Sequence, residues 1–259
     1  MLPHIYIFGQ RIVCYDVIAQ IAAIIGFVYF CLSIWKFNIK PIQIVIFVIL
    51  GILVQYFGGT LIPLLYRWIY FHQTPWWNVW ERSPGRYFHS VILSMIFFLI
   101  LYSKCFKWPT KKVLDVYVIA LILASAIGRI GCFLQGCCGG KPCDLPWAVR
   151  FPRHPEVSLH PTQVYMVFLE TALWIILLVL NKRKRYDGQT FWVGVFLYSI
   201  YRIGIEFVRT NPIFILGLTH AQVFSIFTLT LSLAVLLLGE NIPGFPGKMP
   251  RDPLSRDHS

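Results

Sequence analysis

Charged residues are scarce in this sequence, and acidic residues are the scarcest of them. Only 13% of the 259 residues are charged, and 11 aspartates and glutamates stand against 23 lysines and arginines. Hydrophobic residues make up 57% and the mean hydropathy is +0.66, so a water-soluble fold would expose too much apolar surface. The composition therefore excludes a soluble enzyme or a soluble binding domain, and the bilayer is the natural solvent of this chain.

Long polar stretches and internal repeats are also missing, so no soluble second domain is expected. A helix that crosses ~30 Å of hydrocarbon needs roughly 20 apolar residues. Seven runs of about this length follow one another, at residues 12–35, 42–70, 87–106, 113–131, 163–180, 189–208 and 220–238. We predict an all-α integral membrane protein, a bundle of about seven transmembrane helices. It forms one membrane domain over 1–239 with outer loops at 71–86 and 139–162, and a short flexible tail at 240–259.

The basic residues predict the orientation of the helices. Thirteen of them follow the first, third and fifth runs or lie in the tail, and eight lie on the opposite side. Since cytoplasmic loops carry the excess of Lys and Arg, the N-terminus is expected outside and the C-terminus in the cytoplasm. The net charge of +12 is then a topology signal and an attraction to anionic lipid, and we expect no nucleic acid partner.

Two arginines lie inside the apolar runs, Arg129 and Arg202. A charge in hydrocarbon costs at least about 2.5 kcal/mol on insertion scales, so each suggests a functional site. Arg202, Glu206 and Arg209 are spaced i, i+4 and i+7, which places them on one helical face. The other polar residues at depth also fall in the outer half: Tyr15, Asp16, His89, Glu170 and Gln222. Together they predict a polar cavity that opens toward the outside or the outer leaflet.

This polar layer has two readings. Arg202, Glu206 and Glu170 can form a buried ion network that only fixes helix register. Alternatively, the excess of positive charge binds an anionic ligand such as phosphate. Arg129 has no acidic residue within reach on its own helix, so its partner is that ligand, Asp16 or Glu170. His89 taken alone is as well explained by core packing as by catalysis.

Glycines and cysteines crowd the end of the fourth run, in the segment 128–140. The glycines predict a break in the helix there, and its free backbone amides beside Arg129 would suit an anionic headgroup. Four cysteines follow closely: Cys132, Cys137, Cys138 and Cys143. Their spacing is not a usual zinc spacing, so we expect no metal and favour a disulfide or packing, with a redox or thiol-acceptor role as the remainder. Cys14, Cys31 and Cys105 are isolated and predicted to pack as small apolar residues.

Four ordered motifs carry a family resemblance. The segment 128–140 resembles the signature G-R-x-G-N-F-x-N-x-E-x-x-G of bacterial prolipoprotein diacylglyceryl transferases. The segments 144–152, 160–165 and 201–209 are similar to the family's D-L-P-W-G-V-x-F-P, H-P-[ST]-Q-L-Y and F-R-x-x-V-E-F-F-R. This chain departs from the signature at Cys132 and Gln135, which replace asparagines, and at Cys137, which replaces a glutamate.

The resemblance implies an activity. Members of the family transfer the diacylglyceryl group of phosphatidylglycerol to the lipobox cysteine thiol of secreted preproteins, forming a thioether and releasing glycerol phosphate. They work at the extracytoplasmic side of the bacterial plasma membrane, and no cofactor is implied. Two alternatives remain, a catalytically silent paralogue that binds anionic phospholipid and a transporter or channel.

The resemblance also implies roles for residues. Arg129 and Arg202 match the family's essential arginines, and His89 matches the candidate base for the thiol. Substrate-binding positions are expected at Tyr15, Gln135, Gly139, Gly140, His160, Gln163, Glu206, Arg209 and Gln222. The two glycines are expected to let the loop approach the lipid headgroup.

Overall fold

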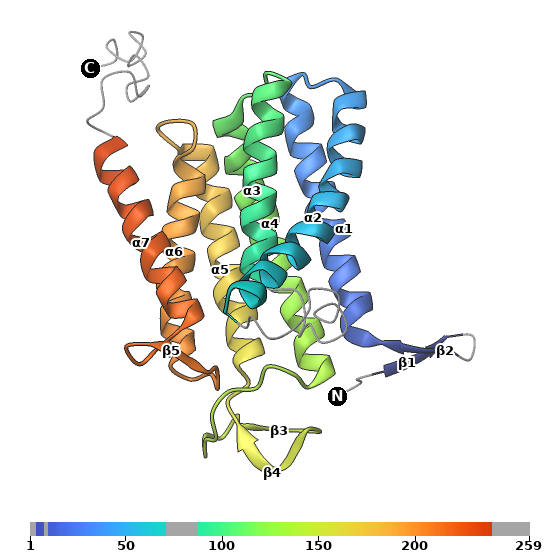
Figure 1. Ribbon diagram of the computed structural model, residues 1–259, viewed down its shortest axis with the longest axis vertical. Coiled ribbons are helices and arrows are strands. Elements are labelled where there is room, and N and C mark those ends of the chain that lie inside the picture. Colours follow the sequence, from blue (N-terminus) through green and yellow to red (C-terminus); the bar gives the residue numbers. More distant parts are fainter. Residues whose placement is uncertain (1–3, 8–9, 71–87, 240–259) are drawn as a thin grey trace, which may run out of the picture. The chain divides into compact units, whose positions relative to one another are not determined.

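The computed structural model describes residues 4–7, 10–70 and 88–239, with side chains for 13–55, 57–58 and 91–238. Seven α-helices dominate the described part of the chain (Figure 1). They are α1 (Cys14–Ile34), α2 (Pro41–Tyr70), α3 (Phe88–Cys105), α4 (Thr110–Gln135), α5 (Thr162–Arg183), α6 (Gln189–Glu206) and α7 (His220–Gly239). Each coincides with one of the seven apolar runs, so the predicted all-α architecture is confirmed.

Short antiparallel hairpins connect or precede the helices. The strand β1 (His4–Ile7) pairs with β2 (Gln10–Val13), β3 (Val149–Phe151) with β4 (His154–Leu159), and β5 (Ile213–Ile215) with β6 (Leu218–Thr219). The last two pairs lie in the connections after α4 and α6, at the ends of the helices that hold the candidate site (Figure 1).

Four helices among the described residues are long and apolar enough to cross a membrane: Cys14–Phe37, Thr110–Gln135, Thr162–Arg183 and His220–Leu238. Shorter apolar stretches lie at Pro41–Gln55 and Val91–Cys105. Large apolar side chains on the helices are exposed, for example 70% of Phe97 and 72% of Phe168. Such surfaces are stable against lipid, where a helix also satisfies its own backbone hydrogen bonds.

The chain divides into two compact units, and the smaller one comprises Cys31–Leu114. Its core is aromatic and joins α2 to α3. The ring of Phe47 stacks on Phe98 with centroids 5.2 Å apart. Gln43 accepts a hydrogen bond from the Tyr102 hydroxyl at its backbone oxygen (2.6 Å) and one from the Trp108 indole at its side chain (3.1 Å). These contacts tie the basic ends of α2 and α3 together.

The larger unit contains Met1–Phe30 and Asp115–Ser259, and all residues of the candidate site with described side chains belong to it. The helix α6 packs against both α5 and α7, and the hydroxyls of Ser199 and Thr228 lie 2.8 Å apart across the α6–α7 interface. The first half of α1 packs closely on α4. A side chain at Gly26 would overlap Ala124, and one at Gly131 would press on Ile18.

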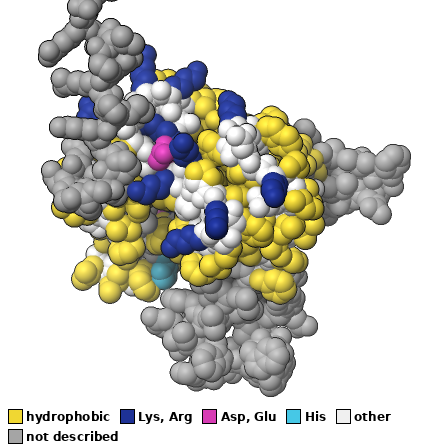
Figure 2. Space-filling model, turned by 90° about the horizontal axis from the view of Figure 1, so that it is seen from above, with side chains coloured by type: hydrophobic (Ala, Val, Ile, Leu, Met, Phe, Trp, Pro, Cys, Tyr) yellow, Lys and Arg dark blue, Asp and Glu magenta, His cyan; other side chains and the backbone are white. Residues whose placement is uncertain are grey.

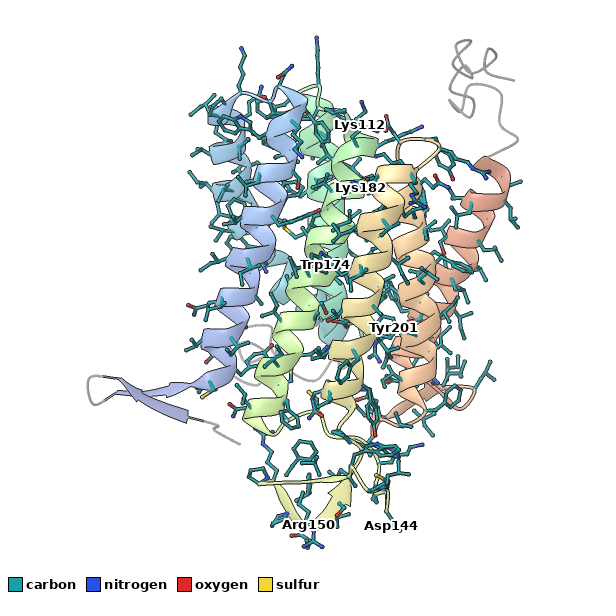
Figure 3. The ribbon with its side chains drawn as sticks, turned by 180° about the vertical axis from the view of Figure 1, so that it is seen from behind. Lys112, Asp144, Arg150, Trp174, Lys182 and Tyr201 are labelled. Atoms are coloured by element: carbon teal, nitrogen blue, oxygen red, sulfur yellow. The ribbon has the colours of Figure 1, made fainter. Side chains whose placement is uncertain are left out.

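Basic residues gather at the α5–α6 connection of this unit, where Lys182, Arg183, Lys184 and Arg185 follow one another. Figure 2 looks onto this end of the helices and shows lysine and arginine side chains standing among hydrophobic ones. Lys182 is labelled at this end in Figure 3, while Asp144 and Arg150 are labelled at the other end, near β3 and β4.

Candidate active site

Arg129 on α4 lies opposite a carboxylate of α5. Its Nε atom is 3.8 Å from Oε1 of Glu170, whose side chain is completely buried. The same Oε1 accepts a hydrogen bond from the Tyr201 hydroxyl of α6 (2.5 Å), and Tyr201 is labelled in Figure 3. Of the partners open from the sequence, Glu170 is therefore the one that faces Arg129. Asp16 is an exposed residue near the start of α1.

Glu206 organises a second group at the end of α6. Its Oε2 is 2.5 Å from Arg202 NH1 and 3.7 Å from Arg209 Nε. Its Oε1 accepts hydrogen bonds from Asn211 and from the Thr219 hydroxyl (2.9 Å). Glu206 thus contacts both arginines, as the sequence suggested, although α6 ends at Glu206 and Arg209 lies beyond the helix. This carboxylate ties the end of α6 to the start of α7.

The two groups contain more positive than negative charge. Three guanidinium groups, those of Arg129, Arg202 and Arg209, face the two carboxylates of Glu170 and Glu206. Burial lowers the pKa of Arg209, and the positive charges of Arg202 and Arg129 lower it further. Arg209 NH1 donates only to the sulfur of Met166, at 3.7 Å. A buried group of this kind is stabilised by an additional anion.

Several buried polar atoms around the arginines have no hydrogen-bond partner among the described residues. They are Gln135 Oε1, Gln163 Oε1, Glu170 Oε2 and Arg209 Nε. Buried polar atoms are normally paired, so each unpaired one calls for an explanation. Three of these atoms are acceptors, which favours a ligand with hydrogen-bond donors such as hydroxyl groups, while Arg209 Nε and the excess of positive charge favour an anionic group on the same ligand.

The loop after α4 is held by hydrogen bonds to the start of α5 and to the residues after α6. Gln163 donates its side-chain amide to the Cys137 carbonyl, and Thr162 donates its hydroxyl to the Cys138 carbonyl (2.7 Å). The backbone amide of Lys141 donates a hydrogen bond to the carbonyl of Val208 (2.8 Å), just beyond the end of α6. The loop therefore links the start of α5 to the end of α6.

The predicted helix break falls within the segment 128–140. The helix α4 continues through Gly128 and Gly131 and ends at Gln135, where Gly136 takes a positive φ of 68°. Gly131 allows the close approach of α1, which explains its presence inside a helix. The break is therefore made at Gly136, and the two earlier glycines of the segment are helical.

The two loop glycines are explained by contacts within the protein. A side chain at Gly140 would overlap the Val208 carbonyl, and one at Gly139 would press on Phe151 and Leu159. Close packing against β3, β4 and the end of α6 thus takes the space in which a headgroup had been expected to approach these glycines.

All seven cysteines are free thiols, so of the reading favoured from the sequence, a disulfide or packing, the structure shows no disulfide. Cys132, Cys137 and Cys138 nevertheless lie together, with sulfur atoms within 4.8 Å of one another, whereas Cys143 stands outside this group. The pKa of the Cys138 thiol is lowered because the thiols of Cys132 and Cys137 hydrogen bond to its sulfur, and Arg209 and Arg129 add to the effect.

An apolar cavity of about 120 Å³ lies between α4 and α5, the helices that carry Arg129 and Glu170. Its walls include Ile130, next to Arg129, and Thr171, next to Glu170; the other lining residues are Leu123, Ala126, Ile127, Val167 and Trp174. Trp174 is labelled near the middle of α5 in Figure 3. The site therefore combines a charged end with an apolar space, as a lipid with an anionic headgroup requires.

The remaining predicted residues join the site to different degrees. Tyr15 lies within electrostatic range of Arg129 and Cys132. His160 lies in the loop before α5, and its Nδ1 is 3.3 Å from the hydroxyl of Tyr165 in α5. Gln222 accepts a hydrogen bond from the Thr219 amide (3.0 Å) and so reaches Glu206 only through Thr219. His89 is in α3, and its side chain lies outside the described residues.

Sequence reasoning missed several contributors. Tyr201 lies in the motif 201–209, but the motif does not predict the hydrogen bond that its hydroxyl donates to Glu170. Asn211 and Thr219 lie beyond α6 and were overlooked as partners of Glu206. The available signal was the position of Tyr201 directly before Arg202, which turns it toward a neighbouring helix face.

Comparison with known proteins agrees with this geometry. The family model described as prolipoprotein diacylglyceryl transferase matches residues 3–238. Proteins named phosphatidylglycerol–prolipoprotein diacylglyceryl transferase are similar to the chain. The one from Clostridium tetani is 34% identical over 160 residues (60% of this chain, 64% of that protein). One from Dehalococcoides mccartyi is 33% identical over 175 residues (62% and 66%). That of Clostridioides difficile is 28% identical over 220 residues (85% and 88%).

The first two alignments thus span just under two thirds of those relatives, while the family model covers nearly the whole of this chain. The four motifs, the seven helices and the arginine groups lie inside the matched residues. The chain therefore belongs to the prolipoprotein diacylglyceryl transferase family.

Proposed function

We propose that this chain transfers the diacylglyceryl group of phosphatidylglycerol to the lipobox cysteine thiol of secreted preproteins. A thioether forms and glycerol phosphate is released. The names of the similar proteins from three bacterial species support the lipid, the preprotein and the reaction type.

One observation carries the proposal: three largely buried guanidinium groups share two completely buried carboxylates. A phosphodiester brings one negative charge, which balances the excess. Arginine binds phosphate oxygens through paired N–H donors, and such hydrogen bonds are among the strong ones. An acyl chain would lie along the cavity between α4 and α5, while the headgroup meets Arg129.

The residues then divide the work. Arg129 and Arg202 bind the phosphate and stabilise the charge that develops on its oxygen as the carbon–oxygen bond breaks. Glu170 and Glu206 orient the guanidinium groups. The attacking sulfur must be a thiolate, and His89 is the base proposed from the resemblance. Gln135 and Gln163 offer buried amide oxygens that can accept hydrogen bonds from the glycerol hydroxyls.

The same proposal includes the setting of the reaction. The lysines and arginines of the α5–α6 connection support placing this end in the cytoplasm, with the arginine groups toward the outer face of a bacterial plasma membrane. The N-terminus is then outside and the C-terminus inside. The proposal keeps one membrane domain over 1–239 with seven spans; the expected outer loop 71–86 and the expected tail 240–259 lie outside the described residues.

The test uses purified full-length protein with phosphatidylglycerol and a lipobox peptide, and mass spectrometry follows the gain of a diacylglyceryl unit. We expect transfer by the wild type and by Lys182→Ala, which removes a basic residue at the other end of α5. Arg129→Ala should lose transfer by a factor on the order of 10² to 10³. Full activity of Arg129→Ala would refute the mechanism. Lipid binding without any transfer would instead indicate a silent, lipid-binding relative.

A further inference from the structure

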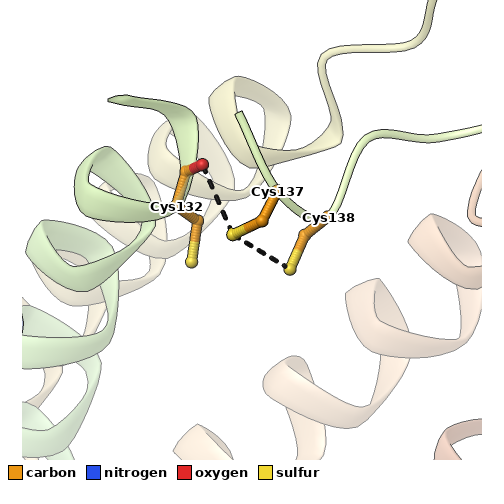
Figure 4. Close-up of side chains that lie close together, drawn as sticks. All are labelled: Cys132, Cys137 and Cys138. Atoms are coloured by element: carbon orange, nitrogen blue, oxygen red, sulfur yellow. Dashed lines mark hydrogen bonds between the residues drawn. The ribbon is translucent and has the colours of Figure 1, made fainter. Parts of the chain in front are cut away.

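Three thiols gather at the point where α4 ends. Cys132 lies on the last turns of α4, and Cys137 and Cys138 follow the turn at Gly136. All three sulfur atoms are within 4.8 Å of one another, and those of Cys137 and Cys138 are 3.7 Å apart. Figure 4 shows the three side chains converging on one side of the turn.

Contacts within the turn and from α5 hold this arrangement. The Cys137 amide donates to the Cys132 carbonyl (3.2 Å), which closes the turn. Cys138 has a positive φ of 63°, a costly conformation for a residue that is not glycine. Thr162 and Gln163 at the start of α5 donate to the carbonyls of Cys138 and Cys137. The backbone fold therefore positions the thiols, with no disulfide between them.

We propose that Cys132, Cys137 and Cys138 bind a zinc ion as three thiolates, and that its fourth position receives the thiol of the preprotein cysteine. The second half of this proposal rests on the proposed function, whereas the metal site stands without it. The sequence spacing had argued against a metal; the folded geometry argues for one.

The distances suit zinc. With Zn–S bonds of about 2.3 Å in a tetrahedron, neighbouring sulfur atoms are roughly 3.8 Å apart. The Cys137–Cys138 separation of 3.7 Å already matches this edge. Since no sulfur pair exceeds 4.8 Å, the remaining edges need to shorten by no more than about 1 Å, which a change of side-chain rotamer provides.

The charges suit it as well. Zinc with three thiolates carries a net charge of −1, and Arg129 and Arg209 both lie within electrostatic range of Cys138. The completed site is therefore attracted by the arginines, although a bare divalent cation would be repelled by them.

The fourth position gives the site a chemical purpose. Among the residues with described side chains, no histidine, aspartate, glutamate or further cysteine belongs to the same group of ligand atoms. Zinc with three protein ligands is the arrangement of catalytic sites, which keep one exchangeable position. Zinc coordination deprotonates a thiol, and the thiolate is the nucleophile that alkylation of sulfur requires.

The step then balances as follows. The preprotein thiol binds zinc, which lowers its pKa, and its proton passes to His89, the base in the proposed function. The sulfur uses an electron pair to form a bond to the glyceryl carbon, and the bond between this carbon and the phosphate oxygen breaks. That oxygen keeps the bonding pair, so glycerol phosphate leaves as an anion beside Arg129. Nothing is oxidised or reduced, and the neutral thioether dissociates from the metal.

The metal site is tested with cobalt(II), a coloured substitute for zinc, added to purified full-length protein that has been reduced and stripped with a chelator. We expect one equivalent to bind with a sulfur-to-cobalt charge-transfer band that zinc abolishes. Cys137→Ser and Cys138→Ser should weaken or lose the band, while Cys143→Ser, a cysteine of the same loop outside the cluster, should keep it. Circular dichroism checks that each variant remains helical.

Two outcomes would overturn the metal site. The first is the absence of a charge-transfer band in the reduced wild type, or an unchanged band in both cluster variants. The second is a disulfide among the three cysteines in protein taken directly from membranes, detected by mass spectrometry of peptides, which would make the cluster a redox pair.

The role of the fourth position is tested on the cobalt-loaded protein. A lipobox peptide should shift the band, and the same peptide with its cysteine replaced by serine should not. Removing the metal should lower transfer at neutral pH on the order of tenfold, since a few per cent of a free thiol is ionised there. Transfer that is unchanged after metal removal would overturn this role and leave the proposed function standing. Cobalt binding without transfer under any condition would overturn the proposed function and leave the metal site standing.

Discussion

Two buried polar clusters occupy opposite ends of the larger unit, and they are built differently. At the α5–α6 connection, Asp115 of α4 is completely buried and fully satisfied. Its Oδ2 lies 2.6 Å from Lys184 Nζ and 2.8 Å from the Gly188 amide, and its Oδ1 accepts from the Phe191 amide at 2.8 Å. One carboxylate, one ammonium group and two backbone donors complete each other, so this cluster needs no ligand.

The arginine cluster at the other end comprises Arg129, Arg202, Arg209, Glu170 and Glu206. Unlike the Asp115 cluster, it leaves buried polar atoms without partners among the described residues. Three guanidinium groups share two carboxylates, and Glu170 Oε2 and Gln163 Oε1 are buried without hydrogen-bond partners among the described residues. Both clusters join helices distant in sequence, so both contribute to the fold. The difference teaches that burial of charge alone does not indicate function, whereas an excess of one charge together with unpaired atoms does.

The largest expected effect is a loss of stability when the satisfied cluster around Asp115 is disrupted. Asp115→Ala leaves the Gly188 and Phe191 amides buried and unpaired, and should lower the free energy of unfolding by roughly 3 kcal/mol. Transfer per folded molecule should stay the same. Denaturant titration of the protein in detergent measures the first quantity, and the lipobox peptide assay the second.

Asp187→Ala is the matched control for this change. Its carboxylate is 3.5 Å from the same Lys184 but is 39% exposed, so its removal should cost about 0.5 kcal/mol or less. Equal destabilisation by both variants would mean that Asp115 is not the centre of this cluster.

The next effect concerns the incomplete cluster. Arg202→Lys keeps the positive charge opposite Glu206 but removes the forked donors that hold a phosphate, so transfer should fall on the order of 100-fold. Stability should change little, because the ion pair with Glu206 can form again. Lys184→Arg, an exchange of the same two residue types in the satisfied cluster, should leave transfer unchanged. A similar loss in both variants would erase the distinction between the clusters.

Much of this arrangement could be predicted because lipid imposes strong constraints. The apolar runs gave helix ends within a few residues, since a span must satisfy its backbone internally. The contacts of Arg202, Glu206 and Arg209 followed from helical spacing alone. Helical spacing could not decide between Glu170 and Asp16 as the partner of Arg129, because that contact depends on how α4 packs against α5.

The missed features share this cause. Asp115 and Lys184 are 69 positions apart, and no local pattern relates them. The cysteine cluster depends on the left-handed turn at Gly136 and on the bonds from Thr162 and Gln163, which the cysteine spacing does not encode. The segment 128–140 predicted a helix break but not which glycine makes it; Gly131 stays helical where α1 packs against it, and the break comes at Gly136. Tertiary contacts overrode local propensity in each case.

The smallest effect tests whether the cavity beside the arginine cluster holds an acyl chain. Val167 lines this cavity on α5, so Val167→Phe fills part of its volume and should raise the KM for long-chain phosphatidylglycerol about three- to tenfold, corresponding to roughly 1 kcal/mol. Short-chain phosphatidylglycerol should be affected less, since it does not need the full length of the cavity. Ile175→Phe introduces the same ring on the same helix at a residue that is 51% exposed, and should change neither value. Equal effects on both lipids would place the acyl chain elsewhere and confine the substrate site to the arginine cluster itself.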